Sequence, residues 1–450
     1  MARGTKNWRQ VVAAAGLVLT MGAVAACGSG SSDDDGKTSA ATTSASSDVS
    51  GTLTFYNFLP EGNEGRWWDR FVADFEQRYP DAKVDVTRYS TEDYWTKTLA
   101  AFSSGDEPDV FIPNAGEDLD KYIRAGRIAA LEEIVDVDAY NPSTLEPFKD
   151  RAGHLNGVPI YSYIILGWAN EDLLAEHGVS VPRTWDELLA ACGRLSAAGV
   201  TPLAMGNAGQ DQFTTGQLQD ALLYQLGGAG TTRDAAYGTD DVSWTDDNFV
   251  SGAEQMKALI DARCFPKGFT GMNYSQMTNL FAQGKAAMTF TGSWFADQVE
   301  SSGARFRTAV FPLPDAPGAT HSTERLEGIL GGVNGLAASA KAAEKNPALV
   351  AAFLDSFGDV VDDYANTNSQ LSVAADPRPQ GSALQRSLSE VFSSAREIAP
   401  VSDTILPSTL RGEYNGSVVA LTSGELTPEE WAKAMAETSE RERPNFPELG

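Results

Sequence analysis

Hydrophobic positions near the start of the folded chain follow two different periods. Residues 52–58 (TLTFYNF) are rich in aromatic and β-branched residues, and residues 83–87 (KVDVT) alternate between apolar and polar positions. Both patterns predict short strands. Between them, aromatic residues recur every four positions and predict a helix with one buried stripe, formed by Trp67, Phe71, Phe75 and Tyr79.

The alternation of strand and helix continues along the chain. Residues 108–112 (PDVFI) predict a buried strand, and the helical pattern that follows ends near Gly126. A further strand is expected at 201–206 (TPLAMG), with helices near 213–226 and 249–262. Strands that alternate with helices predict βαβ units and a mostly parallel sheet, so the expected fold class is α/β.

One long apolar run interrupts this pattern. Residues 157–170 (GVPIYSYIILGWAN) are too many for one typical strand and too irregular for a membrane span. We expect this segment to carry the chain from one sheet to another, and residues 307–314 (RTAVFPLP) to make a second crossing. Between these crossings, Thr184 and Glu187 have the spacing of a capping box, which predicts the start of a helix.

The first 26 residues have the pattern of a signal peptide. Three cations and no acids precede the mostly apolar stretch 11–26, which is too short to span a bilayer comfortably. The sequence VAAC at 24–27 resembles a bacterial lipobox, in which the cysteine is lipidated and becomes the new N-terminus. The alternative is an ordinary secretory signal with an incidental Cys27.

Residues 27–50 predict a flexible leash. After Cys27 they are almost wholly Gly, Ser, Thr, Ala and Asp, a composition that cannot bury a core. One acyl chain holds a protein to a membrane only marginally, whereas several give a stable anchor. We therefore expect Cys27 to be the lipid anchor at the extracytoplasmic face of the bacterial cell membrane, with the folded body standing off that surface.

Composition limits the class of partner. The formal charge of the chain is −27, and it becomes −30 when the three cations of the leader are removed. Such an acidic body repels phosphate backbones, which argues against nucleic acid. Nine Trp, 20 Phe and 13 Tyr supply aromatic surface for a core and for a binding cleft.

Four stretches of the sequence carry a family resemblance. They are the lipobox leader, residues 178–204 (GVSVPRTWDELLAACGRLSAAGVTPLA), residues 281–295 (FAQGKAAMTFTGSWF) and residues 332–357 (GVNGLAASAKAAEKNPALVAAFLDSF). In order and spacing, nearly all of 51–440 resembles the extracellular solute-binding proteins of ABC importers, specifically the carbohydrate-binding family that includes the maltose-binding proteins.

The resemblance implies a periplasmic-binding-protein-like fold of two α/β lobes, joined by crossing strands and closing on a ligand in the cleft between them. We expect a signal peptide at 1–26, the leash at 27–50, a first lobe from 51–162 and 312–358, and a second lobe from 163–311 and 359–450. The implied function is that of a monomeric, membrane-anchored sugar-binding component of an ABC importer. It would deliver its ligand to the permease, and the aromatic richness favours an oligosaccharide.

A sugar site needs aromatic faces for the sugar ring, and carboxylate and amide groups for its hydroxyls. Trp294 follows a glycine turn at the C-terminal end of a predicted strand, where open α/β sheets bind ligands, and the resembled family also places a stacking aromatic there. Burial of Trp294 in the core is the alternative. In the first lobe, Asn57 and Glu61 lie in the first βα loop, and Asn114 and Glu117 follow the strand at 108–112.

Further candidates lie in the second lobe and near the expected hinge. Asp211 and Gln212 follow the strand at 201–206, with Asp211 favoured as an acceptor for a hydroxyl group. Tyr163 and Trp168 either line the cleft or pack at the hinge. Tyr414 is a late aromatic that either lines the cleft or belongs to the core.

Cys192 and Cys264 both fall in the expected second lobe. In an oxidising compartment such a pair is either bridged or left as two buried thiols, and we favour the disulfide. The three histidines, His154, His177 and His321, do not have metal-ligand spacing with one another or with a cysteine.

We therefore expect no metal, no cofactor and no catalytic site. Two alternative functions remain open at the level of sequence. Paired carboxylates among the 61 acids are compatible with a lipid-anchored glycoside hydrolase. A sugar receptor that does not serve a transporter is the other alternative.

Overall fold

The computed structural model describes residues 49–58, 62–150, 152–378 and 381–446. The predictions for the signal peptide, for residues 27–48 of the leash with Cys27, and for Glu61 lie outside the described residues. The folded part begins slightly earlier than predicted, because Val49 near the expected end of the leash is buried in the core.

Within the described ranges, the strands follow the order β2-β1-β3-β8-β4-β6-β5, with β7 beside β4 and β9 beside β8. Their bounds are β1 Gly51–Asn57, β2 Ala82–Arg88, β3 Val110–Phe111, β4 Val158–Asn170, β5 Thr201–Ala204, β6 Ala286–Gly292, β7 Thr308–Phe311, β8 Ile329–Ala338 and β9 Ile398–Pro400. We call the part built around β1, β2 and β3 the first lobe, and the part built around β5 and β6 the second lobe.

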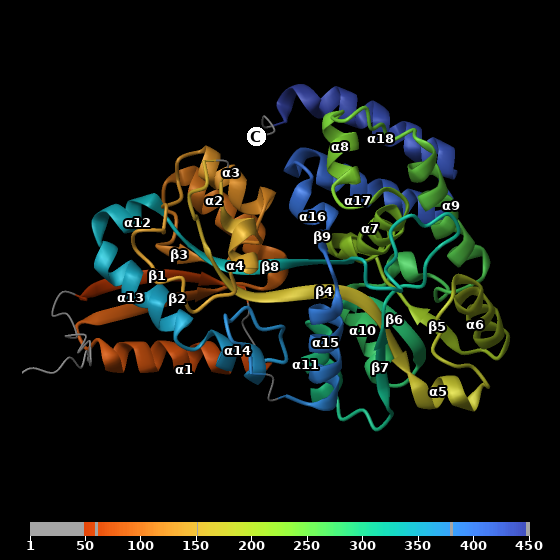
Figure 1. Ribbon diagram of the computed structural model, residues 1–450, viewed down its shortest axis with the longest axis horizontal. Helices are drawn as coiled ribbons and strands as arrows, with labels where there is room; N and C mark the ends of the chain where they lie inside the picture. Colours follow the sequence, from red (N-terminus) through yellow and green to blue (C-terminus); the bar gives the residue numbers. More distant parts are fainter. Residues whose placement is uncertain (1–48, 59–61, 151, 379–380, 447–450) are drawn as a thin grey trace, which may run out of the picture. The chain divides into compact units, whose positions relative to one another are not determined.

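Helices follow the strands in both lobes (Figure 1). Their bounds are α1 Gly62–Arg78, α2 Thr91–Ser104, α3 Glu117–Arg124, α4 Pro142–Leu145, α5 Glu171–Glu176, α6 Trp185–Ala197, α7 Phe213–Gly227, α8 Thr231–Tyr237, α9 Asp247–Asp261, α10 Tyr274–Ala282, α11 Phe295–Ser301, α12 Ala340–Lys345, α13 Pro347–Gly358, α14 Val361–Thr367, α15 Ala383–Ser394, α16 Ser402–Ile405, α17 Ser408–Ser423 and α18 Pro428–Glu442.

The predicted α/β class is correct, and the predicted parallel pairing is found among the strands around which each lobe is built. β1 pairs in parallel with β2 and β3, and β5 pairs in parallel with β6. The strands between the lobes are antiparallel, because β4 and β8 run past each other in opposite directions. The sheet is therefore mixed, with its antiparallel part where the chain crosses.

β4 is the expected crossing strand. Its residues 158–164 pair with β8, whereas residues 165–169 pair with β6 and residues 167–170 pair with β7. One continuous strand thus changes hydrogen-bond partner between Ile164 and Ile165, and Figure 1 shows it running from the first lobe into the second.

The second crossing differs from the prediction. Residues 308–311 form β7, which stays beside β4 in the second lobe. The segment after β7 also packs there, because the Gln225 side chain on α7 donates to the Pro314 carbonyl oxygen and accepts from the Ala316 amide. The chain returns through β8, so residues 312–328 belong to the second lobe.

The first lobe also extends beyond the predicted boundary at residue 358. Tyr364 of α14 packs edge-on against Trp67 of α1 at 4.8 Å. Further on, the Leu371 carbonyl oxygen accepts from the Ser162 amide, and the Val373 carbonyl oxygen accepts from the Asn141 amide. We therefore place the last crossing after residue 375, before α15 packs on the second lobe.

Three of the four residues of the predicted stripe lie on α1 and are buried in the core of the first lobe, whereas Tyr79 follows the end of α1 and is half-buried. Trp67, Phe71 and Phe75 have exposed fractions of 3%, 7% and 2%, and they pack against Phe353 and Phe357 of α13. Burying a side chain of this size contributes about 1.5–3 kcal/mol. The stripe therefore explains why this segment is helical and which of its faces points inward.

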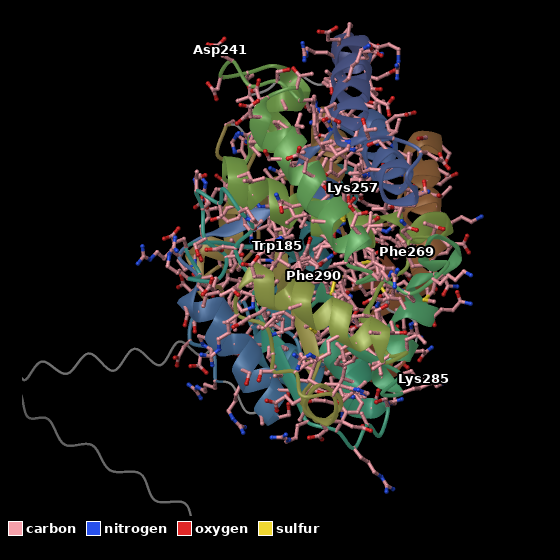
Figure 2. The ribbon with its side chains drawn as sticks, turned by 90° about the vertical axis from the view of Figure 1, so that its right-hand side faces the viewer. Trp185, Asp241, Lys257, Phe269, Lys285 and Phe290 are labelled. Carbon is pink, nitrogen blue, oxygen red and sulfur yellow. A yellow bond between two sulfur atoms is a disulfide. The ribbon has the colours of Figure 1, made fainter. Side chains whose placement is uncertain are left out.

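In the second lobe, a disulfide joins Cys192 of α6 to Cys264, three residues after α9. The two Cα atoms are 4.7 Å apart, and both side chains are fully buried. Figure 2 faces this lobe and labels Trp185 at the start of α6 and Lys257 on α9. The predicted capping box of Thr184 and Glu187 begins α6.

Across the described ranges, none of the helices has the length and apolar content that a bilayer crossing requires.

Candidate functional site

Trp294 stands where β6 ends and α11 begins, and its side chain is half-buried. Its Nε1 donates to the Tyr274 hydroxyl of α10 at 2.7 Å, and the Tyr163 ring of β4 meets it edge-on at 5.2 Å. Gly292 makes this arrangement possible, because a Cβ there would lie 2.1 Å from the Trp294 ring. The indole is thus held in one orientation at the end of the strand.

A polar cluster joins α3 of the first lobe to α16 and α17 of the second. Arg411 Nη1 of α17 donates to Asp118 Oδ1 of α3 at 2.9 Å and to the Asp403 carbonyl oxygen at 2.7 Å. The Asp118 carboxylate is almost fully buried, with an exposed fraction of 4%. Two helices from different lobes therefore meet at one ion pair.

Asn114 and Asn334 extend this cluster towards the crossing strands. Asn114 Nδ2 donates to Asp118 Oδ2 at 2.8 Å, and Asn334 Nδ2 of β8 donates to Asn114 Oδ1 at 2.7 Å. Lys121 lies one turn further along α3 and contacts Asp118 Oδ1 at 3.3 Å. The two amides and the carboxylate are the kinds of group that bind sugar hydroxyls.

The pKa values of the two carboxyl groups in the cluster, Asp118 and Asp403, are shifted in opposite directions. Burial raises the pKa of Asp118, but the charges of Arg411 and Lys121 and the hydrogen bond from Asn114 outweigh it and lower that pKa overall. For Asp403, burial dominates and raises the pKa, with Arg411 and Asn415 offsetting only part of the effect. Asp118 is therefore the firmly ionised partner of Arg411.

Tyr163 links the aromatic pair to the polar cluster. Burial raises its pKa, and the negative charges of Asp403 and Asp118 raise it further, so its hydroxyl lies in the field of both carboxylates. An aromatic face next to fixed donors and acceptors can hold a polar ring. Among the described residues, no group of three or more His, Cys, Asp or Glu side chains could hold a metal ion.

Three of the predicted ligand residues are buried away from this cluster. Trp168 is fully buried, donates to the Thr291 carbonyl oxygen at 3.1 Å and packs against Phe295. Tyr414 is fully buried in the second-lobe core, beside Trp244 and Trp431. Asn57 also has no exposed surface. In this arrangement the three side chains offer no exposed surface to a ligand, so their role as ligand residues stays a prediction.

The remaining candidates are placed as follows. Glu117 pairs with Arg124 of its own helix at 2.5 Å. Gln212 is half-buried and precedes Phe213, whose ring packs against Tyr274 at 5.6 Å, so it lies on the Trp294 side of the site. The Asp211 side chain, like Glu61, lies outside what the structure describes.

Sequence reasoning missed the polar centre of the site, namely Asp118, Asn334, Asp403, Arg411 and Tyr274. Two local signals pointed close to it. Asp118 directly follows the candidate Glu117, and Arg411 lies three positions before Tyr414 on the same helix.

A hollow of about 250 Å³ lies on α1 of the first lobe, away from this cluster. Trp67, Phe71 and Phe75 form its floor, and these rings belong to the lobe core. Its polar rim consists of arginines and aspartates with a serine, without an amide side chain. We therefore favour the cluster around Trp294 and Asp118 as the functional site.

Asp220 explains why Tyr414 points inward and gives a testable pH dependence. The Tyr414 hydroxyl donates to Asp220 Oδ1 at 2.7 Å, and the Ser402 amide and hydroxyl donate to Oδ2. Burial nevertheless raises the pKa of Asp220 to about 7, despite these hydrogen bonds. Folding therefore takes up a proton at this residue between about pH 4 and pH 7.

We expect the free energy of unfolding to fall as pH rises from about 4 to about 7, because this stabilisation is complete below the unfolded pKa and lost above the folded one. For Asp220 alone the loss is at most about 4 kcal/mol. In Asp220→Asn this component disappears. Urea unfolding at pH 4, 5.5, 7 and 8 measures the difference between variant and wild type, and a constant difference across these pH values would contradict the assignment. Glu64→Gln serves as a positive control. Burial also raises the pKa of Glu64 to about 7, so its difference from wild type should depend on pH in the same direction.

Comparisons with known proteins agree with this architecture. A Streptococcus mutans protein named a multiple sugar-binding protein is 24% identical over 249 residues, which cover 54% of this chain and 58% of that one. An uncharacterized ABC transporter extracellular-binding protein of Pyrococcus horikoshii is 24% identical over 250 residues, covering 54% and 55%. The chain spans about half the length of these curated relatives.

A solved structure described as a chitin oligosaccharide binding protein superposes with a TM-score of 0.77 at 24% identity, covering 88% of this chain and 99% of that one. This likeness shows the two-lobe solute-binding fold. Residues 60–358 match the family described as bacterial extracellular solute-binding protein, whose members bind solutes rather than transform them. Because this match covers more than half of the chain and the fold agrees with it, the chain belongs to the bacterial extracellular solute-binding protein family.

Proposed function

We propose that the protein captures a sugar between its two lobes and delivers it to the permease of an ABC importer. The observation that carries the proposal is that Tyr163 packs against the half-buried Trp294 ring and also lies in the field of the Asp118 and Asp403 carboxylates, which belong to a polar cluster built from both lobes. A sugar ring stacks its C–H face on an aromatic side chain and directs its hydroxyls to amides and carboxylates. In this assignment Trp294 and Tyr163 form the aromatic wall of the site. The Asn114 amide and the Asp403 carboxylate form hydrogen bonds with the hydroxyl groups of the sugar.

The relatives support a sugar over other solutes. The Streptococcus mutans protein is named for sugars, and the superposed structure is described as binding a chitin oligosaccharide. The name of the Pyrococcus horikoshii relative supports service to an ABC transporter. An oligosaccharide fits the proposal best, with Gln212 as a further contact. Asp211 and Glu61 stay contacts expected from the sequence alone.

A thermal-shift screen across mono- and oligosaccharides tests the function. A ligand present at 100 times its Kd raises the free energy of unfolding by about 2.7 kcal/mol, which is a readily measured shift in melting temperature. The expected result is a clear shift with a small set of related sugars. Amino acids and peptides at the same concentrations serve as controls, and a shift with these alone would contradict the proposal. Recovery of the bound oligosaccharide uncut excludes a hydrolase.

The proposed anchor at Cys27 has its own test. In Cys27→Ser, the lipid cannot be attached, so the protein is expected to appear in the medium or to accumulate as unprocessed precursor. Fractionation into membrane and medium, followed by intact-mass measurement, distinguishes these outcomes from wild type. A variant that stays in the membrane and is processed at the same position would show that Cys27 is not the anchor.

A further inference from the structure

The contact between the lobes at the candidate site is made by side chains that each lobe holds in place on its own. In the first lobe, Asn114 and Lys121 fix the Asp118 carboxylate. In the second lobe, the Asp403 carbonyl oxygen fixes the Arg411 guanidinium. The 2.9 Å ion pair therefore joins two groups that need little rearrangement to meet.

The helix that carries Arg411 is firmly attached to the second lobe. Tyr414, one turn after Arg411, donates to the buried Asp220 of α7, and Ser402 of α16 donates to the same carboxylate. α16 in turn contacts α3 across the lobe boundary (Figure 1). Arg411 is thus expected to move together with α7 and the rest of the second lobe.

Beside the ion pair, the backbone of the first lobe at Gly116 lies close to the backbone of the second lobe at Thr404. Gly116, which precedes α3, has a φ of +83°, and a Cβ at this position would lie 2.5 Å from the Thr404 carbonyl oxygen of α16. Only glycine allows the two lobes to come this near. The ion pair and the glycine contact lie side by side, so they form or break together when the lobes move.

We propose that the Arg411–Asp118 ion pair is a latch that holds the two lobes closed across the candidate site without bound solute. Arg411 and Asp118 are then positioning residues, which set how often the site opens to admit a solute. Opening releases both charged groups to water and so leaves neither buried and unpaired. The latch is therefore reversible, and it depends on the two-lobe fold rather than on the identity of the solute.

The test uses the whole mature protein without any sugar. Small-angle X-ray scattering measures the radius of gyration of wild type, Arg411→Met and Asp118→Asn at about 20 mM and about 500 mM salt. Both variants are expected to be more extended than wild type at both salt concentrations, because salt screens a nearly buried ion pair only weakly. Hydrogen exchange of residues 116–124 and 402–405 should accelerate in both variants.

Matched variants separate a latch from a merely structural ion pair. Arg124→Met removes the same type of charge from α3, but its partner Glu117 lies in the same lobe, so the radius of gyration should stay at the wild-type value. Arg411→Lys keeps the charge and should give an intermediate radius. If Arg411→Met fails to fold, Asp118→Asn decides. A wild-type radius and wild-type exchange in Asp118→Asn would overturn the latch and leave the sugar-binding proposal untouched.

Discussion

Replacing Trp294 with alanine is expected to weaken sugar binding at least tenfold while the protein remains folded. The ring is held by Tyr274 and Tyr163 and is only half-buried, so part of its surface is accessible to a ligand. Burying a large apolar side chain against a ligand contributes on the order of 1.5–3 kcal/mol, and each 1.4 kcal/mol is about tenfold in Kd. Calorimetric titration with the best sugar from the thermal-shift screen measures this loss.

Two controls distinguish a binding role from a packing role for Trp294. Tyr274→Phe removes the hydroxyl that accepts from the indole and should weaken binding less than Trp294→Ala. Trp168→Ala truncates a fully buried tryptophan and should lower the free energy of unfolding by about 3–5 kcal/mol. If Trp294→Ala instead shows this loss of stability, or binds sugar like wild type, Trp294 belongs to the core.

Removal of the disulfide between Cys192 and Cys264 is expected to have a large effect on stability. The bridge closes a loop with a sequence separation of 72 residues, and constraining such a loop in the unfolded chain contributes about 4 kcal/mol. Urea unfolding of the oxidised protein, of the reduced protein and of the Cys192→Ala/Cys264→Ala double variant should show this loss in the last two samples. Thiol labelling of denatured, unreduced protein should find neither cysteine reactive; labelling of both would show that the bridge is absent.

Several elements were predictable because their signals are local. The four-residue aromatic spacing of α1 and the capping box of α6 involve contacts within one helix or with its immediate flank. Residues 307–314 were also correctly predicted to contain a strand, which is β7. Its partner was not predictable, since pairing β7 with β4 depends on residues almost 140 positions earlier in the chain.

The true second crossing had a signal of a different kind. β8 contains glycines where neighbouring groups approach closely, and a Cβ at Gly332 would lie 2.5 Å from the Tyr163 hydroxyl. Glycines inside a strand mark such approaches and weaken the usual apolar pattern. In β8, Gly331, Gly332 and Gly335 therefore interrupt the apolar run that marks β4, the other strand between the lobes.

Strand geometry explains why Trp168, one of the predicted site residues, is buried away from Trp294. Successive side chains of a strand point to opposite faces, so Tyr163 and Trp168, five positions apart on β4, cannot face the same side. In the structure Tyr163 packs with Trp294, whereas Trp168 packs with Phe295 behind the strand. The two-residue period of the strand shows that only one of the two side chains can face the ligand site. To decide which one, the position of the second lobe must be known.

The choice between Arg411 and Tyr414 required tertiary structure altogether. Both lie on α17. Arg411 faces α3, where it pairs with Asp118. Tyr414 faces the second-lobe core, where it contacts Asp220 and Trp244. Asp118 was missed for a similar reason, since its partner Arg411 lies 293 residues away in the sequence. The binding partners of such charged groups are set by the folded chain and not by neighbouring residues.

The interleaving of the two lobes along the chain has a consequence for how the protein is made. The Trp67 indole of the first lobe donates to Asp363, which lies 296 positions later, and its ring packs on Phe357 and Tyr364. The ribosome must therefore synthesise most of the chain before the first core can close, and contacts of such long range also form slowly. During synthesis the chain stays open for a long time, in the state that a translocation channel for unfolded chains requires. A fragment ending before β8 would lack the residues that complete either lobe.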